Sequence, residues 1–128
     1  MEVAKGSLHA IVGGNGAGKS TTLKAVCGIC RPYRGKVKVL GKPVEKYKQQ
    51  ELFRGCLAML PQDPKSLFVK KTVLEDLQEM TQNEQDIRET AEICQITSLL
   101  KSHPYDLSGG EQQRAALAKV LLTRPQLL

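Results

Sequence analysis

The apolar positions of this chain fall into short runs, separated by stretches with helical periodicity. Ser7–Val12 and Leu57–Leu60 are short, mostly apolar runs that stop at a glycine and at a proline, as strands buried in a parallel sheet do. At residues 36–39 valines alternate with lysines, which predicts a half-exposed strand reaching Gly41. The pattern therefore predicts two buried strands and one half-exposed strand.

Helices are predicted around these runs. Lys19–Cys27 has the periodicity of a helix that Gly28 ends, and residues 45–54 form a short polar helix. Thr72-Val-Leu-Glu75 is a capping box, a sequence in which the first and fourth side chains satisfy each other's backbone N–H groups. It opens a helix that continues to about Met80.

A further helix is predicted behind the cap Asn83. Its apolar face consists of Ile87, Ala91 and Cys94. Ser108-Gly-Gly-Glu111 is a second capping box, and the alanine- and leucine-rich helix that follows runs to Thr123. No strand pattern interrupts residues 65–106, so they are predicted to be a helical insert between segments that carry strands.

Composition excludes several classes of protein. The chain is 41% hydrophobic and 25% charged, without a run of 18 apolar residues or a basic-then-apolar amino terminus, which disfavours a membrane span and a secretory signal. The formal net charge is +6. Its lysines are scattered through residues 36–48 and 65–71 and do not form a stripe interleaved with aromatic side chains, so no nucleic acid partner is expected.

The four cysteines raise the question of a metal site. Cys27-Gly-Ile-Cys30 is a C-x-x-C pair, but no second pair follows at the spacing of a zinc site. With Leu23 and Val26 these cysteines fall on one helical face, which favours small apolar core residues. Reduced thiols also fit a cytoplasmic protein.

Gly13–Ser20 matches G-x-x-x-x-G-K-[ST], the phosphate-binding loop, with a predicted strand before it and a helix after it. Its glycines let several backbone N–H groups converge on one anion, and the helix that follows adds the positive end of its dipole. Lys19 would reach the β- and γ-phosphates, Ser20 would bind Mg²⁺, and Thr21 would bond a phosphate. The alternative is a glycine-rich turn without a ligand. The predicted nucleotide-binding residues are Asn15, Gly16, Ala17, Gly18, Lys19, Ser20 and Thr21.

The capping box at Ser108–Glu111 lies within a longer motif, Leu107-Ser-Gly-Gly-Glu-Gln112. A serine and two glycines at a helix start make a second anion-binding terminus, although an ordinary cap would use the same residues. Together with Gly13–Ser20 and Leu60-Pro61-Gln62, the motif resembles the ATP-binding-cassette (ABC) ATPases. The three motifs occur in the order phosphate loop, Q-loop, signature, and this resemblance covers nearly the whole chain.

The resemblance implies an α/β fold with an incomplete, RecA-like P-loop NTPase core and an α-helical subdomain. It divides the chain into a partial nucleotide-binding core (1–64), the helical subdomain (65–107), and the signature with its helix leading back to the core (108–128). Lys19 and Gln62 become the catalytic residues, and Gln62 joins Ser20 at the Mg²⁺ of bound ATP. In the family, Gln62 would also sense the attacking water and move the helical subdomain. The signature residues Ser108, Gly109, Gly110 and Glu111 would contact ATP held by a second cassette, in a homo- or heterodimer.

Residues 59–77, with Tyr105-Asp106, are most similar to the cassettes of energy-coupling-factor importers, which take up vitamins or metal ions such as cobalt and nickel. This implies a transmembrane partner that contacts the Q-loop and helical subdomain, and a place at the cytoplasmic face of the cell membrane. Phe68, Val69 and Leu74 would line the groove for that partner. Alternatively they pack the subdomain's own core.

The family's Asp-Glu pair, its switch histidine and its adenine-stacking aromatic have no match among the 128 residues. His9 and His103 do not fit the switch position, and Tyr33, Tyr47 and Tyr105 do not fit the aromatic one. We therefore expect a truncated cassette that binds ATP with at most residual hydrolysis, because general-base catalysis contributes ~10²–10⁴-fold. Rival hypotheses are an ABC ATPase of translation or DNA repair, and a chain that binds nucleotide without catalysis.

Overall fold

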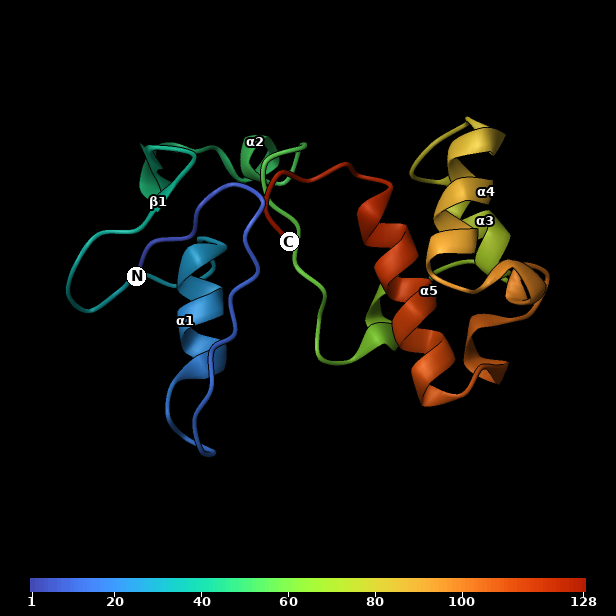
Figure 1. The fold of residues 1–128 in the computed structure, drawn as a ribbon, viewed down its shortest axis with the longest axis horizontal. Helices are drawn as coiled ribbons and strands as arrows, with labels where there is room; N and C mark the ends of the chain where they lie inside the picture. The colour runs from blue at the N-terminus through green and yellow to red at the C-terminus, as the bar shows by residue number, and fades with distance from the viewer. The chain divides into compact units, whose positions relative to one another are not determined.

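The computed structural model describes residues 1–128, apart from the side chain of Gln49. The chain divides into two compact units, Met1–Tyr47 and Lys48–Leu128 (Figure 1).

The first unit contains one helix and one small hairpin. Its elements are α1 (Lys19–Val26), β1 (Lys38–Val39), β2 (Lys42–Pro43) and the 3₁₀ turn η1 (Val44–Lys46). β1 pairs antiparallel with β2, Lys38 opposite Pro43 and Val39 opposite Lys42. Leu40 and Gly41 both have positive φ, 51° and 77°, the geometry of a tight two-residue turn.

Two predictions for this unit are confirmed. The helix from Lys19 ends at Val26 with Cys27 as its C-cap, and Gly28 follows with φ 72°. β1 is half-exposed, with Val39 buried and Lys38 exposed. Cys27 is also buried, as expected of a core residue, whereas Leu23 on the same predicted face is 47% exposed.

The prediction of a buried strand at Ser7–Val12 is wrong. The segment has no strand assignment, all its residues are exposed, and Leu8 is fully so. A strand exists through hydrogen bonds to a neighbouring strand. The sheet formed by the described residues contains β1 and β2, and Ser7–Val12 does not pair with either strand.

The second unit is helical. Its elements are α2 (Gln49–Leu52), η2 (Pro64–Leu67), α3 (Val73–Gln78), α4 (Glu84–Ile93), η3 (Thr97–Leu99), η4 (Pro104–Asp106) and α5 (Gly109–Leu121). The single helix predicted over residues 45–54 is wrong: η1 and α2 are separate, because Tyr47 and Lys48 between them are extended.

Side chains cap all three predicted helix starts of this unit. The capping box predicted at Thr72–Glu75 is only half formed, because the described hydrogen bonds include the one from the Glu75 N–H to Thr72 but none from the Thr72 N–H to the Glu75 side chain. Thr72 Oγ1 accepts the Glu75 N–H at 3.2 Å at the start of α3, and Asn83 Oδ1 accepts the Gln85 N–H at 3.0 Å at the start of α4. Ser108 caps α5. Each cap satisfies an N–H group that has no partner inside the helix.

The core of this unit is aliphatic, and α3 and α4 both pack against α5 around it (Figure 1). Its buried residues are Phe68, Val73, Leu77, Ile87, Ala91, Cys94, Ile96, Leu107, Ala115, Ala116 and Ala118. The predicted apolar face of α4 is thus confirmed. The small alanines of α5 let the neighbouring helices approach it closely.

The run Leu57–Leu60 is only partly strand-like. Leu57 forms a single parallel bridge with Leu127; the Ala58 N–H donates to the Leu127 carbonyl at 2.8 Å, and the Leu127 N–H donates to Cys56 at 2.9 Å. Leu57 and Ala58 are buried, as predicted. The pairing is parallel, but the described residues extend it no further than this bridge. None of the described helices combines the length and apolar character that crossing a membrane takes.

Candidate functional site

The phosphate loop lies in the first unit. Gly16 and Gly18 have φ 83° and 88°, a left-handed backbone that L side chains rarely adopt. A Cβ on Gly13 would lie 3.0 Å from the Cβ of Ala17, so the loop closes tightly on itself there. The path of the loop therefore requires glycine at positions 16 and 18, and it leaves little room for a side chain at position 13.

Lys19 lies at the first position of α1 and its ammonium donates to the Gly13 carbonyl across the loop. The side chain is half-buried, whereas residues 13–17 are exposed. The Thr22 N–H and hydroxyl both donate to the Gly18 carbonyl at 2.9 Å, which closes the first helical turn. The positive charge is thus held at the mouth of the loop.

Within the described residues, no side chain caps α1 at Gly18. The first N–H groups of a helix have no intrahelical partner, so those of α1 are available to a ligand. Ser20 and Thr21, in that first turn, are exposed. An exposed loop, uncapped N–H groups and a lysine across the opening suit a polyphosphate, and the Ser20 hydroxyl suits its Mg²⁺.

The signature lies in the second unit, at the start of α5. Ser108 Oγ accepts the Glu111 N–H at 3.3 Å, and Glu111 Oε1 accepts the Ser108 N–H at 2.9 Å. The Ser108 backbone N–H, and after it the Ser108 hydroxyl, stabilise the Glu111 carboxylate and lower its pKa, and the charge of Arg114 lowers it further. Glu111 therefore acts within this structure as an ionised cap.

Gly109 and Gly110 are the first two residues of α5, and both are exposed. A Cβ on Gly109 would meet nothing within 4 Å in the described part of the chain, and one on Gly110 would meet the Arg114 guanidinium at an ordinary 3.7 Å. Packing within this unit does not require either glycine. Their absent side chains leave the backbone at this helix start open to close approach from outside.

Gln62 is exposed and comes two residues before η2. The turn begins with Asp63, whose Oδ1 accepts the Lys65 N–H at 3.1 Å and whose carbonyl accepts the Ser66 hydroxyl at 2.8 Å. Gln62 and the signature thus belong to the second unit, and Lys19 and Ser20 to the first.

The predicted groove residues have different environments. Phe68 is buried in the core cluster and Leu74 packs against it, whereas Val69 is 69% exposed. The alternative that these residues pack the subdomain's own core holds for Phe68 and Leu74. Val69 stays available as a surface contact.

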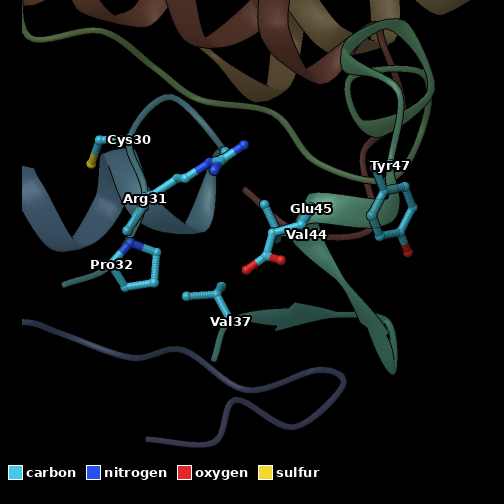
Figure 2. A pocket seen from close by; sticks show the side chains of 9 residues that line it. Cys30, Arg31, Pro32, Val37, Val44, Glu45 and Tyr47 are labelled. Atoms are coloured by element: carbon cyan, nitrogen blue, oxygen red, sulfur yellow. The ribbon is translucent and has the colours of Figure 1, made fainter. Parts of the chain in front are cut away.

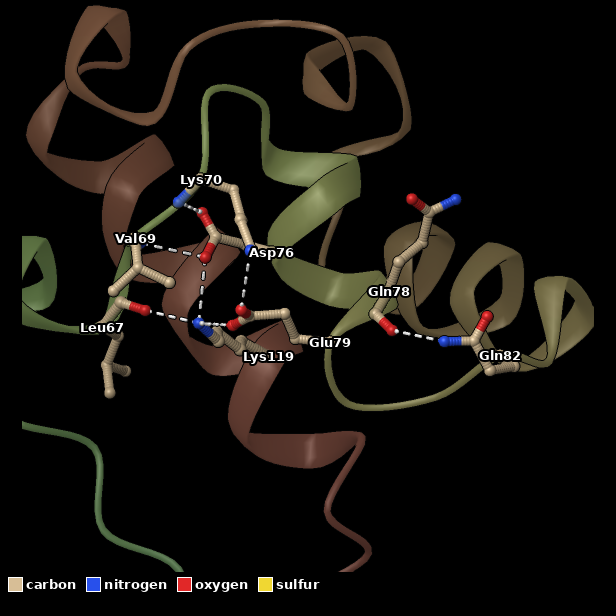
Figure 3. A network of polar contacts seen from close by, with 8 residues as sticks. All are labelled: Leu67, Val69, Lys70, Asp76, Gln78, Glu79, Gln82 and Lys119. Atoms are coloured by element: carbon tan, nitrogen blue, oxygen red, sulfur yellow. Dashed lines mark hydrogen bonds and ion pairs between the residues drawn. The ribbon is translucent and has the colours of Figure 1, made fainter.

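A buried ion pair that no sequence motif indicated joins α3 to α5 in the second unit (Figure 3). Lys119 Nζ lies 3.0 Å from Asp76 Oδ1, and also contacts the Leu67 carbonyl at 2.6 Å and Glu79 Oε2 at 3.5 Å. One signal was present: Lys119 lies three and four positions after Ala116 and Ala115, on the apolar face of α5.

The remaining candidates do not form sites. His103 caps η4, its Nδ1 accepting the Tyr105 N–H at 3.1 Å. Within the described residues, no three His, Cys, Asp or Glu side chains gather as metal ligands. A pocket of about 190 Å³ opens in the first unit, between Arg31, Glu45 and their neighbours (Figure 2). The described residues that line it include none of the predicted site residues.

A glycine-rich loop that closes on a lysine at the start of a helix defines the class of P-loop nucleotide-binding proteins. The chain belongs to the ABC transporter family, which matches residues 1–128 and whose members are ATPases. The P-loop NTPase fold expected from the sequence is thereby confirmed.

Among curated proteins, the energy-coupling factor transporter ATP-binding protein EcfA1 of Mycoplasma pneumoniae is 34% identical over 136 residues. Its counterpart in Mycoplasma genitalium is 33% identical over 136 residues. The chain is covered completely in both comparisons and spans 49% of each relative, about half its length.

Solved structures show the same fold. CbiO1 from Clostridium perfringens, described as part of the ABC transporter complex CbiONQ, has a TM-score of 0.83 and 27% identity, over 98% of this chain and 53% of that one. A bacterial Atm1-family ABC exporter with ATP bound has a TM-score of 0.74 and 25% identity, over 88% and 22% of the two chains. The resemblance to energy-coupling-factor cassettes is thus confirmed as a similarity of sequence and fold.

Proposed function

We propose that this chain binds Mg-ATP through Asn15–Thr21 and is the ATP-binding part of an ABC importer. The observation that carries the proposal is the phosphate loop: left-handed glycines, the uncapped start of α1, and the Lys19 ammonium held across the opening. Together they put a positive charge and backbone N–H donors without intrahelical partners around one exposed loop, and a triphosphate binds through such groups.

The roles of the second unit belong to the same proposal. Gln62 would contact the Mg²⁺ and water of the bound nucleotide, and Ser108–Glu111 would contact ATP on a second cassette. The open backbone at Gly109 and Gly110 supports the second role, because packing within this unit explains neither glycine. In functional terms we divide the chain into a core (1–64), a helical subdomain (65–107) and a signature segment (108–128).

Import, and a place at the cytoplasmic face of a membrane beside a transmembrane subunit, are proposed from the relatives. Two are named for energy-coupling factor transport, and CbiO1 is described as part of a transporter complex. A solved structure of an ABC exporter has the same fold, so the proposal of import rests on the names of the relatives and not on the fold. Co-purification of the chain with membrane subunits is expected; recovery with ribosomes would favour a role in translation.

For this chain we propose ATP binding at the phosphate loop. Members of the family hydrolyse ATP, and we propose that the whole protein does the same. A phosphate-release assay measured beside the binding titration separates the two properties.

Calorimetric titration with Mg-ATP tests the binding proposal. Lys19→Ala removes a charge-assisted contact of about 1.5–3 kcal/mol, so affinity should fall by about 10- to 150-fold. Lys24→Ala is the matched control, because it removes an equal charge from the exposed last turn of the same helix. Equal losses in both variants, or none in Lys19→Ala, would contradict a phosphate site at the loop.

A further inference from the structure

The segment of residues 67–70 is held to the second unit mainly through its backbone. The Asp76 carboxylate, fully buried, accepts the Val69 N–H at 3.0 Å and the Lys70 N–H at 3.3 Å. Lys119 completes the arrangement by donating to the Leu67 carbonyl at 2.6 Å and to Asp76 at 3.0 Å (Figure 3). One buried ion pair therefore fixes three backbone groups of this segment.

Side-chain packing holds only part of the segment. Phe68 is buried in the core, but Val69 is 69% exposed and Lys70 also points to solvent, where its ammonium lies 3.3 Å from Glu79. Burial of apolar surface therefore contributes little to the position of residues 69 and 70. That position depends on the two hydrogen bonds to Asp76, and the carboxylate in turn depends on Lys119.

The segment connects two parts of the proposed site. It continues directly from η2, which begins two residues after Gln62, and Lys119 lies on α5, which begins directly after Ser108. η2 and α5 pack against each other. Leu67, Asp76 and Lys119 thus form a continuous polar connection between η2 and α5.

We propose that Asp76 and Lys119 are positioning residues that make the Gln62 segment and the signature helix move together. The inference rests on the proposed function, because it needs Gln62 to respond to bound Mg-ATP. Neither residue touches nucleotide in this role. They act by transmitting the position of η2 to the start of α5.

Nuclear magnetic resonance of the ¹⁵N-labelled chain tests the coupling, since 14.1 kDa suits the method. Amide signals of residues 107–111 are recorded with and without Mg-ATP, at concentrations that calorimetry shows to saturate. The variants are Lys119→Met, Lys119→Arg and the double variant Asp76→Leu/Lys119→Met. Arg124→Met is the control: it removes the exposed ion pair between Arg124 and Asp86, which lies beyond the end of α5 and does not touch residues 67–70.

Mg-ATP should shift the signature amides of the unmodified chain, of Lys119→Arg and of Arg124→Met. Lys119→Met and the double variant should bind Mg-ATP equally well and lose most of that shift. The double variant distinguishes positioning from stability, because replacing both charges with apolar side chains often preserves stability. Full shifts in Lys119→Met, or none in the unmodified chain with ATP bound, would overturn the inference. Absence of ATP binding itself would instead refute the proposed function, and the coupling with it.

Discussion

Removing one charge of the buried pair tests how much the second unit depends on it. In Lys119→Met, Asp76 would stay fully buried without its ammonium partner, a change that typically costs about 3–5 kcal/mol. The carboxylate keeps two backbone donors, from Val69 and Lys70, so we expect the lower end, about 3 kcal/mol. Domains of this size are stable by about 5–15 kcal/mol, so the loss is a large fraction of the total.

Urea unfolding followed by circular dichroism measures this cost. With a denaturant slope of about 1–3 kcal/mol/M, a loss of 3 kcal/mol lowers the midpoint by about 1–3 M. The double variant Asp76→Leu/Lys119→Met should lose less stability than Lys119→Met, because it leaves no buried charge unpaired and loses only hydrogen bonds to backbone groups. Arg124→Met should cost at most about 1 kcal/mol, since its pair is exposed. If Lys119→Met costs no more than Arg124→Met, the reasoning about the buried pair is refuted.

Three further predictions concern local features. The pKa of Glu111 is lower in the folded than in the unfolded chain, so its ionised carboxylate stabilises the fold fully above the ordinary pKa of 4.5. This stabilisation is lost as the pH falls through the folded pKa, and the stability of Glu111→Gln measured against pH should lack this acid-side loss. Thr72→Ala removes the cap of α3 and should cost about 1 kcal/mol in urea unfolding, whereas Thr72→Ser should cost little. Burial raises the pKa of the Cys27 and Cys94 thiols, so both should react with iodoacetamide more slowly than Cys30. Mass spectrometry measures the labelling rates, and the three rates should become equal in urea.

The parts of the fold that were predictable from sequence are those fixed by near neighbours. The caps at Thr72, Asn83 and Ser108 each join residues two or three positions apart, so composition and spacing suffice to find them. The phosphate loop is local in the same sense: its glycines and Lys19 lie within eight consecutive residues.

What was not predictable depends on distant partners. The expected strand at Ser7–Val12 has the right composition, but a strand also needs a pairing neighbour, and composition does not identify one. Asp76 and Lys119 lie 43 residues apart, and no motif in the sequence pairs them. A lysine on the apolar face of α5 was the available sign that an acidic partner had to be buried opposite it.

The bridge between Leu57 and Leu127 brings together two points at opposite ends of the helical unit. The segment between them, which includes α3, α4 and α5, therefore begins and ends at neighbouring points of the structure. A module whose two ends meet can be lengthened, shortened or exchanged without stretching the chain on either side, since the ends remain adjacent whatever lies between them. Exchange of this helical module would therefore leave the phosphate loop unchanged. A chimaera joined at residues 57 and 127 is the natural way to transplant it.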